Sequence, residues 1–128
     1  MKLAYLDTSA YVKTILEEPE SDRLARWLVD WPQRASCDLL RTEAIRAVRR
    51  HGTEYVAAGR AGFRDLRLIE LDDRLLDAAG ELPVDVRSLD AIHLAAALAL
   101  GADLGRLVTY DERMTTAARE LGLEVVAP

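Results

Sequence analysis

Short apolar runs alternate with amphipathic segments along the whole chain. The first run, Leu3–Leu6, is uncharged and ends at an acid, so it predicts a buried strand. Runs at 35–37, 68–71, 107–110 and 124–126 predict further strands. Between them, apolar residues recur at steps of three and four, which is the spacing of one helix face. Strands that alternate with helices favour an α/β fold with a parallel sheet covered on both faces.

The predicted helices begin at capping residues and end near glycine or proline. They run from Thr8 to before Pro19, from Ser21 to Pro32, from Asp38 to Gly52, over 54–66, from Asp72 toward Gly80, over 89–100 after a Ser88 cap, and over 111–121. Gly59 and Gly62 weaken the prediction over 54–66, because glycine disfavours helix interiors. Trp27 and Trp31 fall on the apolar face of the second predicted helix.

Composition limits the chain to one globular domain. The sequence has 128 residues, of which 50% are hydrophobic and 30% charged, so we expect residues 1–128 to form a single α/β domain. Cys37 is the only cysteine, which excludes an intramolecular disulfide and a thiolate metal cluster and favours a cytoplasmic protein. No segment is long and apolar enough to predict a membrane span.

The charge balance argues against a protein that binds nucleic acid through its overall charge. The formal net charge is −5 and the sequence pI is about 5.0. An anionic ligand must therefore be met by a local basic patch or by a bound metal ion.

Three acids, Asp7, Asp90 and Asp111, stand where strands pass into helices or in the first turn of a helix. Ligands of open α/β sheets bind outside the carboxyl ends of the strands, where Asp7 and Asp111 are expected. Each acid alone is explained as readily by helix capping. Asp90 is harder to explain, because Ser88 already offers a cap and the helix after it is apolar on nearly every side. Arg87 or a metal ion could balance its charge.

Glu43 is a fourth candidate, beside the apolar stripe of the predicted helix that begins at Asp38. Alone it is most simply a surface glutamate that either extends its carboxylate into solvent or pairs with Arg41 or Arg46. Taken together, four carboxylates in one cleft repel each other, and a hard divalent cation relieves that repulsion. All-oxygen ligands favour Mg²⁺ or Mn²⁺ over Zn²⁺. Such a cation lowers the pKa of bound water and neutralises charge on a phosphodiester.

Four segments carry a family resemblance: Tyr5–Ala10 (YLDTSA), Leu39–Glu43 (LLRTE), Arg87–Ala95 (RSLDAIHLA) and Val108–Arg113 (VTYDER). In this order they resemble the PIN-domain nucleases, most closely the VapC-type ribonuclease toxins of type II toxin–antitoxin pairs. The resemblance covers the chain from Leu3 to Val126. It implies a PIN domain with a five-stranded parallel sheet, and Mg²⁺- or Mn²⁺-dependent cleavage of RNA that leaves 3′-hydroxyl and 5′-phosphate ends.

The resemblance also assigns site residues. The catalytic and metal-binding acids are Asp7, Glu43, Asp90 and Asp111. Asp7 and Asp90 are the best direct ligands, whereas Glu43 and Asp111 bind directly, through water or at a second metal ion. Thr8 and Thr109 match hydroxyl positions that orient the acids. We expect a metal-bound water to attack the phosphorus in line, with a carboxylate of the four accepting its proton.

The implied partners are an RNA substrate, a cognate antitoxin protein and a second copy of the chain in a homodimer. Arg46 and Arg49 are candidate RNA contacts, or they belong to a solvated helix face. Trp27 and Trp31 are either core residues or part of a groove for an antitoxin segment. His93, three residues after Asp90, is predicted to be a buried histidine with a satisfied hydrogen bond rather than a ligand or proton shuttle.

The alternative function is a non-catalytic PIN-like module that binds RNA or a protein, although the presence of all four acids argues against it. A receiver domain requires a lysine after a late strand, and no lysine follows Lys13. A dehalogenase-type phosphatase requires an aspartate two residues after Asp7, where Ser9 stands. No Gly-rich loop ends in Gly-Lys-Ser or Gly-Lys-Thr, which excludes a Walker-type nucleotide site.

Overall fold

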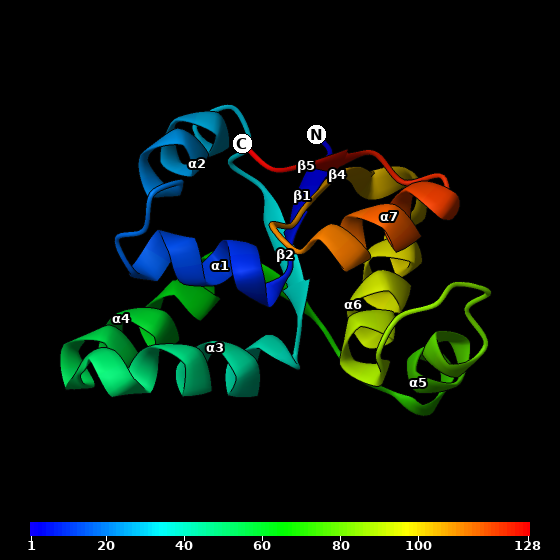
Figure 1. Cartoon of the computed structure of the whole chain (residues 1–128), viewed down its shortest axis with the longest axis horizontal. Helices are drawn as coiled ribbons and strands as arrows, with labels where there is room; N and C mark the ends of the chain where they lie inside the picture. Colours follow the sequence, from blue (N-terminus) through cyan, green and yellow to red (C-terminus); the bar gives the residue numbers. More distant parts are fainter.

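A computed structural model describes all 128 residues and shows one parallel sheet with helices on both faces (Figure 1). The strands are β1 (Leu3–Leu6), β2 (Arg34–Cys37), β3 (Leu66–Ile69), β4 (Leu104–Val108) and β5 (Val125–Val126). They lie in the order β3-β2-β1-β4-β5, and every neighbouring pair is parallel. The predicted fold class, a five-stranded parallel α/β sheet, is confirmed.

The order of the strands creates a switch point beside β1. From β1 the chain adds β2 and then β3 on one side, and afterwards returns to add β4 and β5 on the other side. Leu6 pairs with Val108, so β1 and β4 end at the same level. The crevice outside the carboxyl ends of strands at such a switch point is where open α/β sheets bind ligands.

The helices divide between the two faces of the sheet. One face carries α1 (Thr8–Ile15), α2 (Ser21–Leu28), α3 (Leu40–Val48) and α4 (Thr53–Gly62), and the other carries α5 (Asp73–Gly80), α6 (Ser88–Ala99) and α7 (Glu112–Glu120) (Figure 1). Single 3₁₀ turns span Arg49–His51, Phe63–Asp65 and Gly101–Asp103. None of the helices is long and apolar enough to cross a membrane.

The central strand β1 contributes to two separate cores because successive side chains of a strand point to opposite faces. Leu3 and Tyr5 pack with α5, α6 and α7, whereas Ala4 and Leu6 pack with α1, α2 and α3. All four residues are buried, as expected for a parallel strand that is covered on both faces. The rigid position of β1 fixes the residue that follows it, Asp7.

Two glycines of α4 lie at its helix contacts, Gly62 against α1 and Gly59 against Ile45 of α3. The Tyr11 hydroxyl of α1 donates a hydrogen bond to the Gly59 carbonyl, with an O···O distance of 2.7 Å. A Cβ atom on Gly62 would collide with the same hydroxyl. The glycines that weakened the helix prediction over 54–66 therefore mark the packing contact of that helix, which ends at Gly62.

Several predicted boundaries are wrong by a few residues. β3 and β4 begin and end two or more residues earlier than predicted, because pairing with β2 and β1 sets their register rather than the apolar runs alone. The second predicted helix ends at Leu28, and the Val29 amide bonds to the Arg26 carbonyl in a tighter turn. Trp31 therefore lies beyond the helix. Asp38 and Ser88 are not the N-caps of α3 and α6; Leu39 and Arg87 are, without side-chain caps.

Candidate active site at the carboxyl edge of the sheet

Asp7 follows β1 directly and is held on both carboxylate oxygens. Oδ1 accepts hydrogen bonds from the Ala10 amide at 3.0 Å and the Ser9 hydroxyl at 2.7 Å, and Oδ2 accepts one from the Thr109 hydroxyl at 2.5 Å. Asp7 is thus the N-cap of α1, and it is only 3% exposed. Burial raises the pKa of Asp7, while the hydrogen bonds from Thr109, Ser9 and Ala10 oppose the rise.

Two hydroxyls join the end of β1 to the end of β4. The Ser9 hydroxyl accepts a hydrogen bond from the Tyr110 amide at 3.0 Å, and the Thr109 hydroxyl accepts one from the Asp111 amide at 3.1 Å. Each hydroxyl also donates to Asp7. Thr109 was a predicted supporting residue, whereas Ser9 was not. The available signal was its position two residues after an acid that ends a buried strand.

Glu43 lies in the first turn of α3 and points to neighbours on other elements. Its Oε1 accepts a hydrogen bond from the Thr8 hydroxyl at 2.6 Å and lies 2.8 Å from His93 Nε2. Neither Arg41 nor Arg46 pairs with it, so the simple interpretation of Glu43 as an arginine-paired glutamate is wrong. Burial alone would raise the pKa of Glu43, but the hydrogen bonds from His93 and Thr8 outweigh it and lower that pKa.

His93 is buried inside α6 and has partners at both ring nitrogens. Nδ1 lies 2.8 Å from the Tyr5 hydroxyl and 3.7 Å from the Cys37 sulfur, while Nε2 faces Glu43. The prediction of a buried, hydrogen-bonded histidine is confirmed, with an exposed fraction of 2%. Burial disfavours the charged ring, but the hydrogen bonds to Cys37 and Glu43 outweigh it and raise the pKa of His93 to about 10.

Asp90 and Asp111 occupy the more open side of the edge. Asp90, in the first turn of α6, is half-buried and accepts no hydrogen bond from the protein, whereas Asp111 caps α7 by accepting from the Arg113 and Met114 amides at 2.8 and 3.1 Å. Burial and the charge of Asp111 raise the pKa of Asp90, and the charge of Arg87 opposes that rise. Asp90 therefore has unused oxygens in a negatively charged environment.

The donor chemistry of this edge fits a hard divalent cation, although the side chains do not form a closed cluster. In this arrangement no three Asp, Glu, His or Cys residues lie close enough together to hold a metal ion. Mg²⁺ usually keeps several waters and uses one or two carboxylates, so a closed cage is not required. Burial raises the pKa of Asp7, and burial with the charge of Asp111 raises the pKa of Asp90, so a cation beside either carboxylate would favour its charged form.

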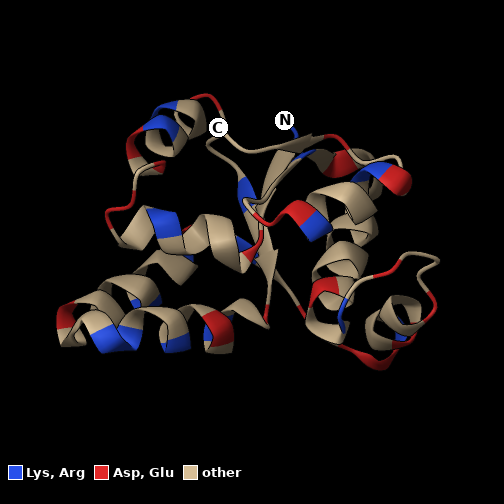
Figure 2. Cartoon of the chain, viewed as in Figure 1, with Lys and Arg blue, Asp and Glu red and all other residues tan.

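Arginines lie on both sides of the acidic edge. Arg46 and Arg49 are exposed and form no salt bridge, and basic segments recur along α3 and α4 (Figure 2). On the opposite side, Arg87 and Arg113 line an open hollow between the loop before α6 and the length of α7, together with Asp85, Glu112 and Glu120. Arg113 was not singled out from the sequence; its signal was its place two residues after Asp111.

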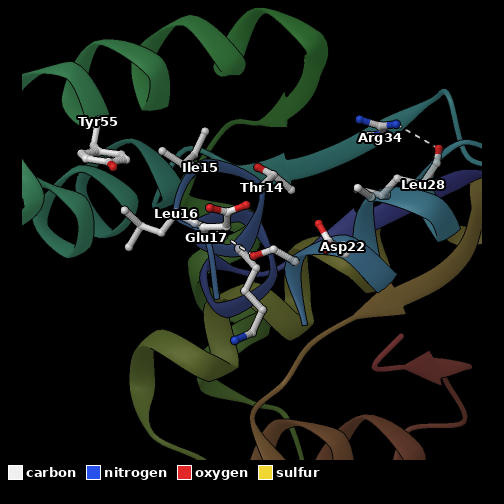
Figure 3. Close-up of a pocket in the computed structure, with 11 residues that line it drawn as sticks. Thr14, Ile15, Leu16, Glu17, Asp22, Leu28, Arg34 and Tyr55 are labelled. Atoms are coloured by element: carbon white, nitrogen blue, oxygen red, sulfur yellow. Dashed lines mark hydrogen bonds between the residues drawn. The ribbon is translucent and has the colours of Figure 1, made fainter. Parts of the chain in front are cut away.

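A separate hollow of about 500 Å³ lies between α1, α2, β2 and α4 (Figure 3). Its wall combines apolar side chains such as Ile15 and Leu28 with charged ones such as Glu17 and Arg34. The Arg34 guanidinium donates to the Leu28 carbonyl at 2.9 Å, which ties β2 to α2 (Figure 3).

The two tryptophans do not line that hollow. Trp27 and Trp31 stack on each other with ring centroids 5.1 Å apart and are half-buried against the core formed by α1, α2 and α3. Packing is thus part of their role, and neither residue is fully enclosed.

Comparisons with known proteins agree with this architecture. The sequence model of the family described as PIN domain matches residues 4–120. Ribonuclease VapC46 of Mycobacterium tuberculosis is 50% identical, over 100% of this chain and 99% of that protein, and Ribonuclease VapC35 of the same species is 44% identical over 98% and 97%.

Solved structures share the fold at low sequence identity. VapC20 of Mycobacterium tuberculosis, a toxin that cleaves the sarcin–ricin loop, superposes with a TM-score of 0.78 at 18% identity, covering 99% of this chain and 100% of that chain. A toxin–antitoxin complex from Klebsiella pneumoniae superposes with a TM-score of 0.76 at 20% identity, covering 98% and 97%.

Proposed function

This chain belongs to the PIN-domain family and is a VapC-type ribonuclease, and we propose that the acids at the carboxyl edge of its sheet cleave RNA with the help of Mg²⁺ or Mn²⁺. The observation that carries the proposal is the buried, three-times hydrogen-bonded Asp7 at the switch point between β1 and β4. All 128 residues form one such domain in this proposal, since β5 lies beyond the matched residues and still completes the sheet.

The acids have different roles in the proposed reaction. Asp7 and Asp90 are the principal ligands of the cation, with Glu43 and Asp111 binding directly or through water. When bound, the cation supplies the positive charge that the acidic protein lacks at the phosphodiester and activates water as the nucleophile. Ser9 and Thr109 keep the Asp7 oxygens in place. A carboxylate of the four would accept the proton of the attacking water.

RNA binding rests on arginines rather than on net charge. In this proposal, phosphates of the strand that crosses the acidic edge bind Arg46 and Arg49 on the α3 side and Arg87 and Arg113 on the α7 side, all of which are exposed. This arrangement explains how a protein of net charge −5 binds a polyanion. We propose the cytoplasm as the compartment, because the RNA targets of a bacterial-type toxin are there.

The protein acts as the toxin of a toxin–antitoxin pair, with a cognate antitoxin as partner. We propose that a segment of the antitoxin occupies the hollow between α1, α2 and α4, whose mixed apolar and charged wall suits an amphipathic segment (Figure 3). Ala25→Arg, at an exposed position of that wall, should abolish complex formation in calorimetry. Ala102→Arg, an exposed position in the Gly101–Asp103 turn, is the matched control.

A homodimer is also part of the proposal. Leu76 of α5 and Leu89 of α6 are large apolar side chains with exposed fractions of 41% and 49%. The two helices pack against each other, and we propose that a second copy of the chain covers both leucines. Light scattering of Leu76→Asp against the unchanged protein tests this surface.

The decisive experiment is RNA cleavage in Mn²⁺ and in EDTA. We expect cleavage of a labelled RNA in Mn²⁺ that stops in EDTA and returns with excess metal. Asp7→Asn, which keeps the size and the cap, should be inactive while retaining the fold. Cleavage that survives EDTA, or an Asp7→Asn protein that cuts normally, would defeat the proposed mechanism.

A further inference from the structure

One buried side chain, at the carboxyl edge of the sheet, connects helices that cover opposite faces of the sheet. His93 belongs to α6, on the same helix as Asp90, and its ring reaches Glu43 of α3, which covers the opposite face of the sheet. The ring also meets Tyr5 of β1, Cys37 of β2 and Thr8 of α1. Groups from four other elements therefore converge on a side chain that is 2% exposed.

We propose that His93 is a positioning residue that selects which oxygen of Glu43 is offered to the cation or its water. The His93 Nε2 atom and the Thr8 hydroxyl both contact Oε1, at 2.8 and 2.6 Å. No protein group donates to Oε2. Because Oε1 is held by these two contacts, Oε2 is the Glu43 oxygen that remains available to the cation or its bound water. This inference rests on the proposed function, because it concerns the same site.

Tyr5 determines the orientation of the His93 ring. Its hydroxyl lies 2.8 Å from Nδ1, and the two rings meet edge to face with centroids 5.9 Å apart. With Nδ1 engaged by Tyr5, Nε2 is directed at Glu43. A ring flip would exchange the nitrogens for carbons and leave the Tyr5 hydroxyl and the Glu43 carboxylate without their partner. Unsatisfied buried polar groups are costly, so the ring is fixed by both ends.

The connection also fixes the separation of two candidate ligands. Glu43 and Asp90 approach the edge from opposite faces of the sheet, and α6 carries Asp90 and His93 three residues apart, about one helical turn. Holding Glu43 on His93 therefore holds it relative to Asp90. Partners that orient the ligands of a metal site typically change metal affinity or activity by about 10–100-fold when they are removed.

The chain offers a matched control, because it has only two histidines. His51 is exposed in the turn after α3, and its ring packs only against Tyr55. His93→Phe keeps the ring volume and removes both nitrogens, and His51→Phe makes the same change outside the site. Tyr5→Phe removes only the hydroxyl that orients the ring.

The test combines Mn²⁺ binding by calorimetry, RNA cleavage, and the ¹⁵N signals of the two imidazoles during a Mg²⁺ titration. We expect His93→Phe to lower Mn²⁺ affinity and kcat about tenfold or more with an unchanged KM for RNA, and Tyr5→Phe to have a smaller effect in the same direction. His51→Phe should match the unchanged protein. Mg²⁺ should shift the Nε2 signal of His93 and not that of His51, and Glu43→Gln should remove the shift.

Folded His93→Phe protein whose Mn²⁺ affinity and kcat lie within twofold of the unchanged protein would overturn the inference. Should His93→Phe fail to fold, Tyr5→Phe and the imidazole titration of the unchanged protein decide it: an Nε2 signal indifferent to Mg²⁺ overturns it. If the unchanged protein neither binds Mn²⁺ nor cuts RNA, the proposed function fails instead, so the two failures are distinguishable.

Discussion

Asp7 and Asp90 lie at the same edge of the sheet in opposite surroundings. Asp7 is 3% exposed and accepts three hydrogen bonds, whereas Asp90 is half-buried and accepts none. Both have raised pKa values, but only for Asp7 do hydrogen bonds from neighbouring side chains limit the rise. The fold therefore fixes one carboxylate in advance and leaves the other to be fixed by its ligand.

The largest expected effect is on RNA cleavage, and we expect it to be the same for both acids. Asp7→Asn and Asp90→Asn should each reduce RNA cleavage in Mn²⁺ by about 100-fold or more, the scale seen when one preorganised electrostatic group is removed from an active site. Cleavage is measured by single-turnover assays on a labelled RNA, with Asp103→Asn, at the other end of the sheet, as the control. Activity within tenfold of normal for either protein would remove that acid from the site.

The second prediction separates the acids by stability. Asp7→Ala should lower the free energy of unfolding by about 2–3 kcal/mol, because a helix cap is lost and buried hydroxyls lose their acceptor. Asp90→Ala should change it by less than about 0.5 kcal/mol, as for a surface substitution that breaks no contact. Urea unfolding without metal measures both. Equal losses would show that the two carboxylates contribute equally to the free energy of unfolding, despite their different hydrogen bonding.

Thr109→Val tests the hydrogen bonds that make Asp7 different. Valine has nearly the shape of threonine but cannot donate to Asp7 Oδ2, so we expect a loss of about 1–2 kcal/mol in unfolding free energy. The pKa of Asp7 should rise further, which moves the acid limb of the cleavage pH profile to higher pH. Thr116→Val, at an exposed position of α7, is the control and should leave both measurements unchanged.

The contrast between these regions also shows what the sequence can predict. An uncharged run that ends at an acid predicted both β1 and the place of Asp7, since a strand end and its next residue are local features. The β4 boundary was wrong because its pairing with β1, a long-range contact, decides where it begins. The acids at helix starts were predicted as caps or ligands, and Asp7 and Asp111 are indeed caps.

The surroundings of Glu43 lay beyond sequence reasoning. Spacing placed Arg41 and Arg46 beside it, but the rotation of α3 turns its carboxylate toward Thr8 and His93 instead. That contact depends on how three helices pack around one sheet edge, and no pattern within one helix specifies it. His93 was predicted to be buried because its neighbours along α6 are apolar. The same local pattern carries no information about Glu43, which lies on another helix, so this partner was not identified.

A smaller effect is expected where the arginines of α3 meet RNA. Arg46→Glu and Arg49→Glu should each weaken RNA binding several-fold and flatten its salt dependence by about one unit of slope, since a lost phosphate contact releases fewer counterions. Binding is measured by fluorescence anisotropy with the inactive Asp90→Asn protein at several salt concentrations. Arg64→Glu, near the amino ends of the strands, is the control. Unchanged binding would assign Arg46 and Arg49 to a solvated face.

The smallest effect concerns pH and stability without metal. Burial and Asp111 raise the pKa of Asp90, so the folded protein binds this proton more readily than the unfolded chain, whose value lies near 3.8. The free energy of unfolding therefore falls as the pH rises from the pKa of Asp90 in the unfolded chain through its higher pKa in the folded protein. Lowering the pH through that window should stabilise the unchanged protein relative to Asp90→Asn. Asp7 contributes equally to the pH dependence of stability in both proteins, so its contribution cancels in the difference between them.

The expected difference is below about 1 kcal/mol, because solvent screens a half-buried carboxyl, and it corresponds to a shift of less than about 5 °C in Tm. Thermal unfolding of both proteins from pH 7 to pH 4 measures it. Saturating Mg²⁺ should reverse the sign at the upper end, since a cation that binds the charged Asp90 stabilises the folded state more as that acid ionises. Equal pH dependence of the two proteins in EDTA would show that folding does not raise the pKa of Asp90 and would contradict its description as a carboxylate left unsatisfied by the fold.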